Sequence, residues 1–487
     1  MDRRVLGGIG WMFLAKLAIR GLGLVSVLVL ARLLSPEDFG LVAMATSIVE
    51  LVALMRAFSF DIVLIQRSDA GPVHFNTAWT LHILFGFLMA TVLYLLSGVG
   101  ADFYNDERLK SVIQVLAISV FIESFGNVGT VYFRKQFDFQ KEFNFMLSRK
   151  IFGFVVTIPL AFLWHSYWAL VAGILSSSIG ATTVSYLMHG YRPRLSLGAV
   201  REILSFSTWI QVNNVLFFTR LRGIDFIVGR IVGAQGLGVL ALATETAGMV
   251  TNELLQPINR ALFPGYADLQ GSLRSMAATY LNVIGGVALV VVPSAVGLAL
   301  VAEDLVLVAF GPKWSSTVIP LQVMAMYGLL VSLQENGTPA FLGLGRPRLV
   351  TGLAALSVIF TMALVIYLTV SRGLVGACVG MLFSVVIMLP INFWAVRRIL
   401  GVTTSMVVRA IWRPIVATTA MAVACHWIQS VVPAVTTGEH AFRLAITFCN
   451  GAAIYIGVIV LLWTKAGRPQ GAESFIHSWL AQRSSAT

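Results

Sequence analysis

The sequence places a few charged residues inside stretches that are otherwise apolar. Lys16 and Arg20 stand four residues apart in the first apolar run, so they share one face of a helix. Arg220, Arg222 and Asp225 form a second group in a later run. Guanidinium groups bind phosphate oxygens through paired hydrogen bonds. The two groups therefore predict a cationic pocket for a ligand that carries phosphate, such as a sugar diphosphate.

A simpler interpretation of these cations stays open. Lys16 could reach the membrane surface along its aliphatic chain while Arg20 pairs with a carboxylate on a neighbouring helix. Arg222 and Asp225 are three residues apart and can pair with each other, which leaves Arg220 to point elsewhere. The two groups would then only form salt bridges between helices. With Arg56 added, the candidate substrate-binding residues are Lys16, Arg20, Arg56, Arg220 and Arg222.

Carboxylates in apolar runs are candidates for ion coupling or for pairing between helices. A carboxylate that the membrane desolvates holds a proton more readily, and several oxygen ligands together can hold sodium. A charge at bilayer depth costs at least a few kcal/mol, so structural pairing with a base is the alternative for each. The candidates are Asp225, Glu245, Glu50 and Glu123.

Composition indicates the elements that carry these residues. The chain of 487 residues is 57% hydrophobic and 11% charged, with a mean hydropathy of +0.85, which is too apolar for one soluble core. Apolar windows long enough to cross a bilayer predict an all-α integral membrane protein with about fourteen transmembrane helices. The windows lie near residues 8–31, 40–63, 77–97, 111–133, 142–163, 167–188, 205–231, 237–262, 276–300, 318–342, 349–369, 374–396, 410–430 and 443–464.

An internal repeat organises these helices. A shift of about 198 positions sets Phe226 to Thr244 beneath Leu28 to Thr46, with Arg32 over Arg230 and Gly40 over Gly238. Each copy is a helix end, a tight turn and a second helix. The repeat predicts two six-helix lobes, residues 1–200 and 201–400, followed by an extra helix pair and cytoplasmic tail at 401–487. Arg32 and Arg230 are then matched gate or interface residues.

Loop charges predict the orientation in the membrane. The net charge is +12, and the basic residues gather in alternate loops, as cytoplasmic loops do. Both termini are therefore expected in the cytoplasm, and the turn at Ser35–Gly40 on the outer side. Because the charge follows topology, the sequence predicts no nucleic-acid partner. Trp164, Tyr167 and Trp168 flank one outer loop, where an aromatic belt is expected in preference to ligand stacking.

Signatures of enzymes and cofactors are missing from the sequence. It has no GxSxG elbow, no Walker loop and no HExxH motif. Cys378, Cys425 and Cys449 lie apart in apolar runs, so they predict small core side chains with neither a disulfide framework nor a metal site. We expect neither an enzyme nor a bound cofactor or metal.

Four stretches together resemble a known family. They are LARLLSPEDFGLVAMATSIVELV from Leu30, RKQFDFQKEFNF from Arg134, LFPGYADLQGS from Leu262 and LVAFGPKW from Leu307. They are similar to the Wzx-type polysaccharide or O-antigen flippases, a branch of the multidrug, oligosaccharidyl-lipid and polysaccharide exporter superfamily. The resemblance covers about the first 400 residues, and the last two helices carry no motif.

The resemblance implies a fold and a function. Two lobes would surround a central cavity, and the protein would flip undecaprenyl-diphosphate-linked oligosaccharide repeat units from the cytoplasmic to the periplasmic leaflet of the bacterial inner membrane. The product would feed assembly of exopolysaccharide, capsule or O-antigen, with polymerase and chain-length machinery as further partners. Two alternatives remain within the same fold: a cation-coupled multidrug exporter and a peptidoglycan lipid-precursor flippase. The exporter is disfavoured because such proteins usually bend the first helix at a proline, whereas this one is proline-free and basic.

Overall fold

The computed structural model describes residues 3–53, 64–65, 69–136, 138–268 and 272–467. Within these ranges it describes only the backbone of residues 3–17, 204–217, 220–221, 252–265 and 267–268. The described part of the chain is helical and contains no strand. Two compact units are formed, Met1–Gly238 and Val239–Thr487. These units divide after Gly238, whereas the predicted lobe boundary at residue 200 was derived from the repeat. The lobes stay a prediction.

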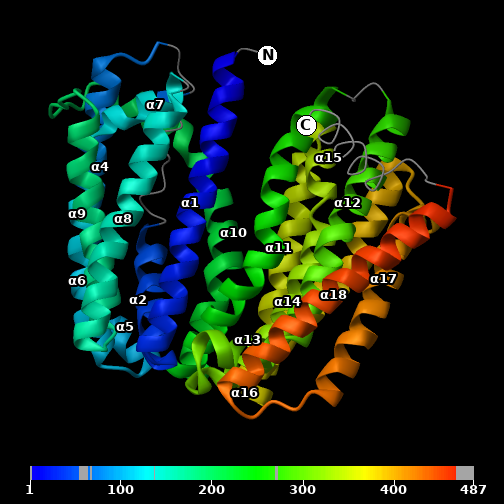
Figure 1. Cartoon of the computed structure of the whole chain (residues 1–487). Helices are drawn as coiled ribbons and strands as arrows, with labels where there is room; N and C mark the ends of the chain where they lie inside the picture. Colours follow the sequence, from blue (N-terminus) through cyan, green and yellow to red (C-terminus); the bar gives the residue numbers. More distant parts are fainter. Residues whose placement is uncertain (1–2, 54–63, 66–68, 137, 269–271, 468–487) are drawn as a thin grey trace. The chain divides into compact units, whose positions relative to one another are not determined.

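The first unit contains most of the residues that the sequence singled out. In Figure 1, α4, α6, α8 and α9 stand side by side, α1 packs against α8, and α2 packs against both α6 and α10. The helices are α1 (Arg3–Leu33), α2 (Pro36–Ala53), α4 (Pro72–Leu95), α5 (Ser97–Tyr104), α6 (Arg108–Ser124), η2 (Val128–Thr130), α7 (Val131–Lys135), α8 (Phe139–Trp164), α9 (Trp168–Met188) and α10 (Val200–Val232).

The turn between α1 and α2 is stabilised by residues within the turn itself. Proline stands at the first position of α2, where its missing N–H costs nothing. The Ser35 hydroxyl accepts from the Asp38 amide at 3.2 Å, and the Asp38 carboxylate accepts from the Ser35 amide at 2.9 Å. The second oxygen of Asp38 accepts from the Tyr167 amide at 3.0 Å. The start of α2 is thereby bonded to the turn between α8 and α9.

The second unit begins inside α11 (Ala234–Asp268). In Figure 1, α18 (red) packs along α17 (orange), and α17 packs against α12. The elements are α12 (Leu273–Leu300), α13 (Ala302–Leu305), the π-helix η3 (Val306–Phe310), the 3₁₀-helix η4 (Pro312–Thr317), α14 (Val318–Gln334), α15 (Gly337–Gly343), α16 (Pro347–Leu400), α17 (Thr404–Val431) and α18 (Thr437–Lys465). Trp314, part of the LVAFGPKW stretch, is fully buried here.

The long element α16 is a hairpin of two helices. Gly373 adopts a φ of +61°, which breaks the helix between the predicted windows 349–369 and 374–396. Beyond this turn the chain runs back along itself, and the Thr361 hydroxyl donates to Ser384 at 3.0 Å. A Cβ at Gly376 would overlap the carbonyl oxygen of Leu368. Close packing, which the GxxxG spacing of this stretch indicates, is therefore present.

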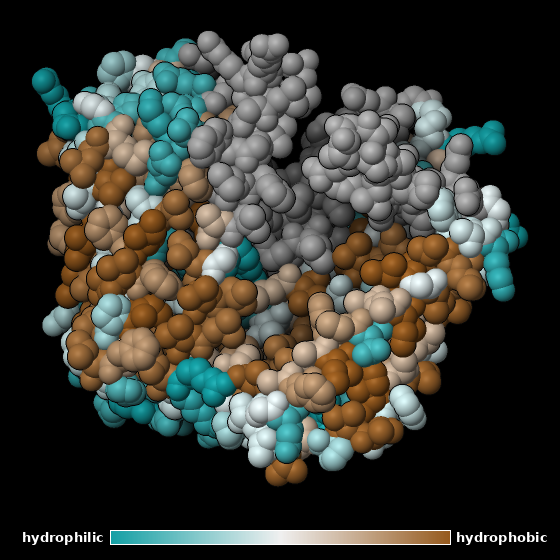
Figure 2. All heavy atoms as spheres, in the orientation of Figure 1, coloured by the Kyte–Doolittle hydropathy of each residue, from teal (hydrophilic) through white to brown (hydrophobic). Residues whose placement is uncertain are grey.

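Length and composition identify the membrane-spanning elements. In the described ranges, 8 helices are long and apolar enough to cross a membrane, or 9 if α6 and α7 form one span bent by 66°. An integral membrane protein is thus confirmed, while the number fourteen stays a prediction. Figure 2 shows the same pattern on the first unit, at the left, where apolar side chains cover the middle of the helices and hydrophilic ones gather at their ends.

The cysteines differ in part from expectation. All three are free, and Cys378 and Cys425 are buried as predicted. Cys449 is exposed on α18, so its assignment to the core was wrong. An apolar run in a membrane helix does not reveal which of its faces meets lipid.

Candidate functional site

The best-defined group of predicted site residues joins α2 to α10. Arg222 on α10 reaches Glu50 on α2 with two parallel bonds, Nε to Oε2 at 2.5 Å and Nη2 to Oε1 at 2.6 Å. Its remaining nitrogen, Nη1, donates to Oδ2 of Asp225 at 3.1 Å. The hydroxyl of Ser47, one turn before Glu50, donates to the same Asp225 oxygen at 3.2 Å. We call these four residues the α2–α10 charge cluster.

The charge cluster is acidic overall, since one guanidinium faces two carboxylates. The Arg222 side chain is 31% exposed, Asp225 18% and Glu50 42%, so the cluster lies at the edge of the packed interior. The predicted pairing of Arg222 with Asp225 is confirmed. For this residue the alternative interpretation, a salt bridge between helices, describes the geometry, because both sides of the guanidinium are already occupied.

Aromatic side chains at the end of α5 and on α10 lie beside the charge cluster. The ring of Tyr104 stacks on that of Phe226 with 6.1 Å between centroids, and Phe103 meets Phe226 edge-on at the same distance. The Tyr104 ring is accommodated at Gly229, where a Cβ would stand 2.6 Å from a ring carbon. The Tyr104 hydroxyl is buried with no hydrogen-bond partner in the described structure.

The predicted gate residue Arg230 lies in the last turn of α10, next to these aromatic side chains. Its Nη1 donates to the carbonyl oxygen of Phe103 at 2.6 Å, and its guanidinium lies over the Phe103 ring at 5.8 Å. It thus binds the last turn of α5, where helix carbonyls lack partners within the helix. Arg32, its match in the repeat, is exposed on the last turn of α1 and has an interaction partner of its own.

Other predicted site residues lie apart from the charge cluster or beyond description. Arg20 is partly buried on α1, and its side chain interacts with neighbouring groups. Glu123 on α6 pairs with Arg149 on α8 at 2.9 Å. Glu245 is an exposed residue of α11 in the second unit and also interacts with neighbouring groups. For Lys16 and Arg220 only the helix backbone is described, and Arg56 lies outside the described residues.

Sequence reasoning missed the partner of Arg222. Glu50 was proposed as a coupling or pairing residue without a partner, and Ser47 was not singled out. Their spacing of three residues on one helix was the available signal, because it places a hydroxyl and a carboxylate on one face. Choosing Arg222 as the partner required the contact between α2 and α10, which only the fold supplies.

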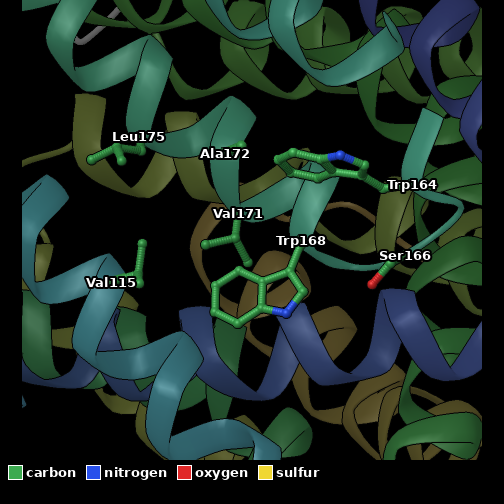
Figure 3. Close-up of a pocket in the computed structure, with 7 residues that line it drawn as sticks. All are labelled: Val115, Trp164, Ser166, Trp168, Val171, Ala172 and Leu175. Carbon is green, nitrogen blue, oxygen red and sulfur yellow. The ribbon is translucent and has the colours of Figure 1, made fainter. Parts of the chain in front are cut away.

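A second feature of the first unit is an apolar cavity near the turn between α8 and α9. Its volume is about 390 Å³, and its lining includes the two indole rings shown in Figure 3, Trp164 and Trp168. Val115 of α6 and three small or branched residues of α9 complete the apolar walls, and Ser166 lies at one end. The aromatic belt at this turn stays a prediction. No cluster of three or more His, Cys, Asp or Glu side chains that could hold a metal occurs among the residues that the structure describes.

The sequence is similar to curated proteins over most of its length. The lipopolysaccharide biosynthesis protein WzxC of Escherichia coli is 24% identical over 423 residues, which cover 85% of each chain. The succinoglycan biosynthesis transport protein ExoT of Rhizobium meliloti is 22% identical over 400 residues, covering 81% of each chain. Both similarities extend well beyond the charge cluster.

A solved structure matches the fold. The lipid II flippase MurJ, in an inward closed conformation, aligns with 94% of this chain and 100% of its own at a TM-score of 0.78 and 12% identity. At this identity the match establishes the fold alone. The model of the family described as polysaccharide biosynthesis protein matches residues 29–319, more than half of the chain and all of the charge cluster. The chain therefore belongs to this polysaccharide biosynthesis family.

Proposed function

We propose that this protein is a flippase for lipid-linked oligosaccharides. It would carry an undecaprenyl-diphosphate-linked repeat unit from the cytoplasmic to the periplasmic leaflet of the bacterial inner membrane, for assembly of exopolysaccharide, capsule or O-antigen. Membership of the polysaccharide biosynthesis family, together with a fold shared with a lipid flippase, is the observation that carries the proposal. The work assigned to the protein is translocation, with no catalytic step.

The proposed route uses basic residues of α1 and α10 together with Arg56, which lies outside the described residues. Lys16, Arg20, Arg56 and Arg220 would hold the diphosphate in a central cavity, while the polyprenyl tail stays in lipid. Arg222 would join them only when its carboxylate partner is displaced, because Glu50 occupies the two nitrogens that a phosphate would need. Substrate and Glu50 would thus compete for one guanidinium, which links binding of the headgroup to release of α2 from α10.

Alternating access would then follow from the repeat. Lobes at residues 1–200 and 201–400 would move relative to each other, with the extra pair at 401–487 on the second lobe, and Arg32 and Arg230 would act at the outer gate. Exchange of the headgroup requires that its binding energy differ little between the two states. Asp225, Glu245, Glu50 and Glu123 stay candidates for ion coupling or interlobe pairing. Both termini would face the cytoplasm, with the polymerase and chain-length machinery as partners.

The first prediction tests the cationic cavity in a deletion strain that carries the gene on a plasmid. Arg20→Ala and Arg220→Ala are each expected to abolish surface polysaccharide, because each removes a cation that holds the diphosphate. The polysaccharide is quantified by gel and sugar analysis, and membrane insertion by immunoblot. Arg201→Ala, in the first turn of α10 at the end predicted to face the cytoplasm, is the matched control and should produce polysaccharide normally. Full production in both cavity variants, at normal protein level, would remove the cavity assignment.

A second candidate, a peptidoglycan-precursor flippase, is favoured by one observation, the TM-score of 0.78 to MurJ. The two functions separate in a strain that lacks this gene and is also depleted of its own lipid II flippase. Growth restored by this protein supports the second candidate, whereas restored polysaccharide without restored growth supports the first.

A further inference from the structure

Two glycines that the repeat equates are in direct contact. Gly40 lies in the first turns of α2 and Gly238 in the first turns of α11, and both are buried. A Cβ at Gly40 would overlap the carbonyl oxygen of Ala234 and lie 2.9 Å from the Gly238 amide nitrogen. A Cβ at Gly238 would overlap the carbonyl oxygen of Pro36 and lie 2.9 Å from the Gly40 amide nitrogen. The two backbones touch with no side chain between them.

The repeat relates these two contacts to each other. Pro36 stands four residues before Gly40, Ala234 stands four before Gly238, and the shift of 198 positions takes each member of the first pair onto the second. A contact in which residue i meets j while the equivalent of j meets the equivalent of i is the mark of a twofold axis. The axis that relates the two helix starts therefore passes between the two glycines.

We propose that this glycine contact is the seal that closes the extracytoplasmic end of the transport path. The inference rests on the proposed function and names the residues that regulate access to the site. Both helices start at the turns that loop charge places outside. Small residues let helix backbones approach closely, and repeats that rock about a shared axis separate such a contact when they open. Any added side chain at either glycine then opposes closure.

Access to the interior tests the seal without requiring transport. In a variant with the native cysteines replaced, Ser47→Cys places a thiol on α2 about two turns inside the seal, where Ser47 is fully buried. The rate of its labelling in spheroplasts by a membrane-impermeant maleimide reports opening to the outside. Gly40→Ala and Gly238→Ala should each raise that rate by on the order of tenfold, because overpacking penalises the closed state.

The control and the contradicting results are specific. Gly98→Ala lies in α5 with open space around the added Cβ, so it should leave the labelling rate unchanged. Equal labelling in wild type and both seal variants, with normal insertion, would overturn the proposal, as would a response in only one of the two, because the contact is symmetric. Faster labelling, combined with unchanged surface polysaccharide when the same glycine substitution is made in the otherwise native chain, would leave the seal standing and remove the proposed function.

A second measurement keeps the seal testable if the alanine variants fail to insert. Glu37 and Gln235 are exposed and equivalent in the repeat, so cysteines at both positions flank the seal. A cleavable bismaleimide between them should stop polysaccharide export, and cleavage of the linker should restore it. Export that continues with the two positions fully crosslinked would overturn the proposal.

Discussion

At the level of single residues, the charge cluster is centred on Arg222, which binds two carboxylates. Arg222 holds Glu50 with two bonds and Asp225 with one. The pairing within α10 could be predicted from sequence, because a spacing of three residues on a helix leaves few alternatives. The pairing between α10 and α2 could not, since 172 positions separate Arg222 from Glu50 and any acidic residue on a neighbouring helix was an equal candidate.

A charge reversal at the pair of Arg222 and Glu50 tests whether transport needs the salt bridge itself or a positive charge at position 222. Arg222→Glu alone places three carboxylates together and should stop polysaccharide export, and Glu50→Arg alone should impair it. The double variant Glu50→Arg with Arg222→Glu restores one salt bridge between α2 and α10. Partial recovery of surface polysaccharide is expected if the bond between helices matters. No recovery, at normal protein level, would instead assign Arg222 a direct contact with substrate that glutamate cannot make.

Another single-residue contact gives a pH dependence in the loop between α5 and α6. Two hydrogen bonds from the Arg108 guanidinium, at 2.9 and 2.7 Å, lower the pKa of Asp106. A carboxylate with a lowered folded-state pKa stabilises the fold above its unfolded-state pKa, about 3.9, and loses this contribution as pH falls through the folded value. Thermal unfolding in detergent should therefore show a larger loss of stability below about pH 4 in wild type than in Asp106→Asn.

The neutral variant also predicts a difference at pH 7. There Asp106→Asn should melt below wild type, because the charged hydrogen bonds are gone while Arg108 remains. Glu107→Gln changes the net charge equally and serves as control. An identical pH profile in wild type and Asp106→Asn would show that the bond adds no measurable stability, as occurs for many exposed ion pairs.

At the level of elements, most helices were predictable and the bends between them were only partly so. The apolar windows predicted α8, α9, α12, α17 and α18, and the break near Gly373 separated two windows as the structure does. The 66° bend between α6 and α7 was not predicted. It occurs where Asn127 caps η2 through its Oδ1, at 2.8 Å from the Gly129 amide, and binds the Tyr191 carbonyl at 2.8 Å. Hydropathy averages over such polar turns.

The hairpin of α16 offers a matched pair of substitutions in one element. Gly376→Ala places a methyl group on the Leu368 carbonyl, whereas Gly352→Ala meets open space. The first should destabilise the protein by about 1–3 kcal/mol through overpacking. The second should be neutral or slightly stabilising, because alanine favours helix over glycine by about 1 kcal/mol. Melting temperatures in detergent compare the two, and equal values would mean that the hairpin relaxes without cost.

At the level of the whole molecule, the helix pair α17 and α18 has no counterpart in the repeat and no sequence motif, yet the second unit holds it firmly. Asp304 on α13 is 1% exposed. It accepts from Arg443 on α18 at 2.6 and 2.9 Å and lies 2.6 Å from Nδ1 of His440. Sequence reasoning could not pair Asp304 with these residues, because they lie more than 130 positions away.

The buried triad of Asp304, His440 and Arg443 predicts how strongly the stability of the helix pair α17 and α18 depends on the Asp304 carboxylate. Asp304→Ala leaves a cation 11% exposed with its main partner removed, and breaking a buried pair of this kind costs about 3–5 kcal/mol. Melting temperature and resistance of the α17–α18 turn to protease should both fall. Removing the cation as well, in Asp304→Ala with Arg443→Met, should recover much of that loss, since no uncompensated charge remains. If the double variant is stable and still exports polysaccharide, the triad fixes the position of the helix pair. If it is stable but exports nothing, Asp304 and Arg443 act in transport itself, and the helix pair belongs to the moving parts.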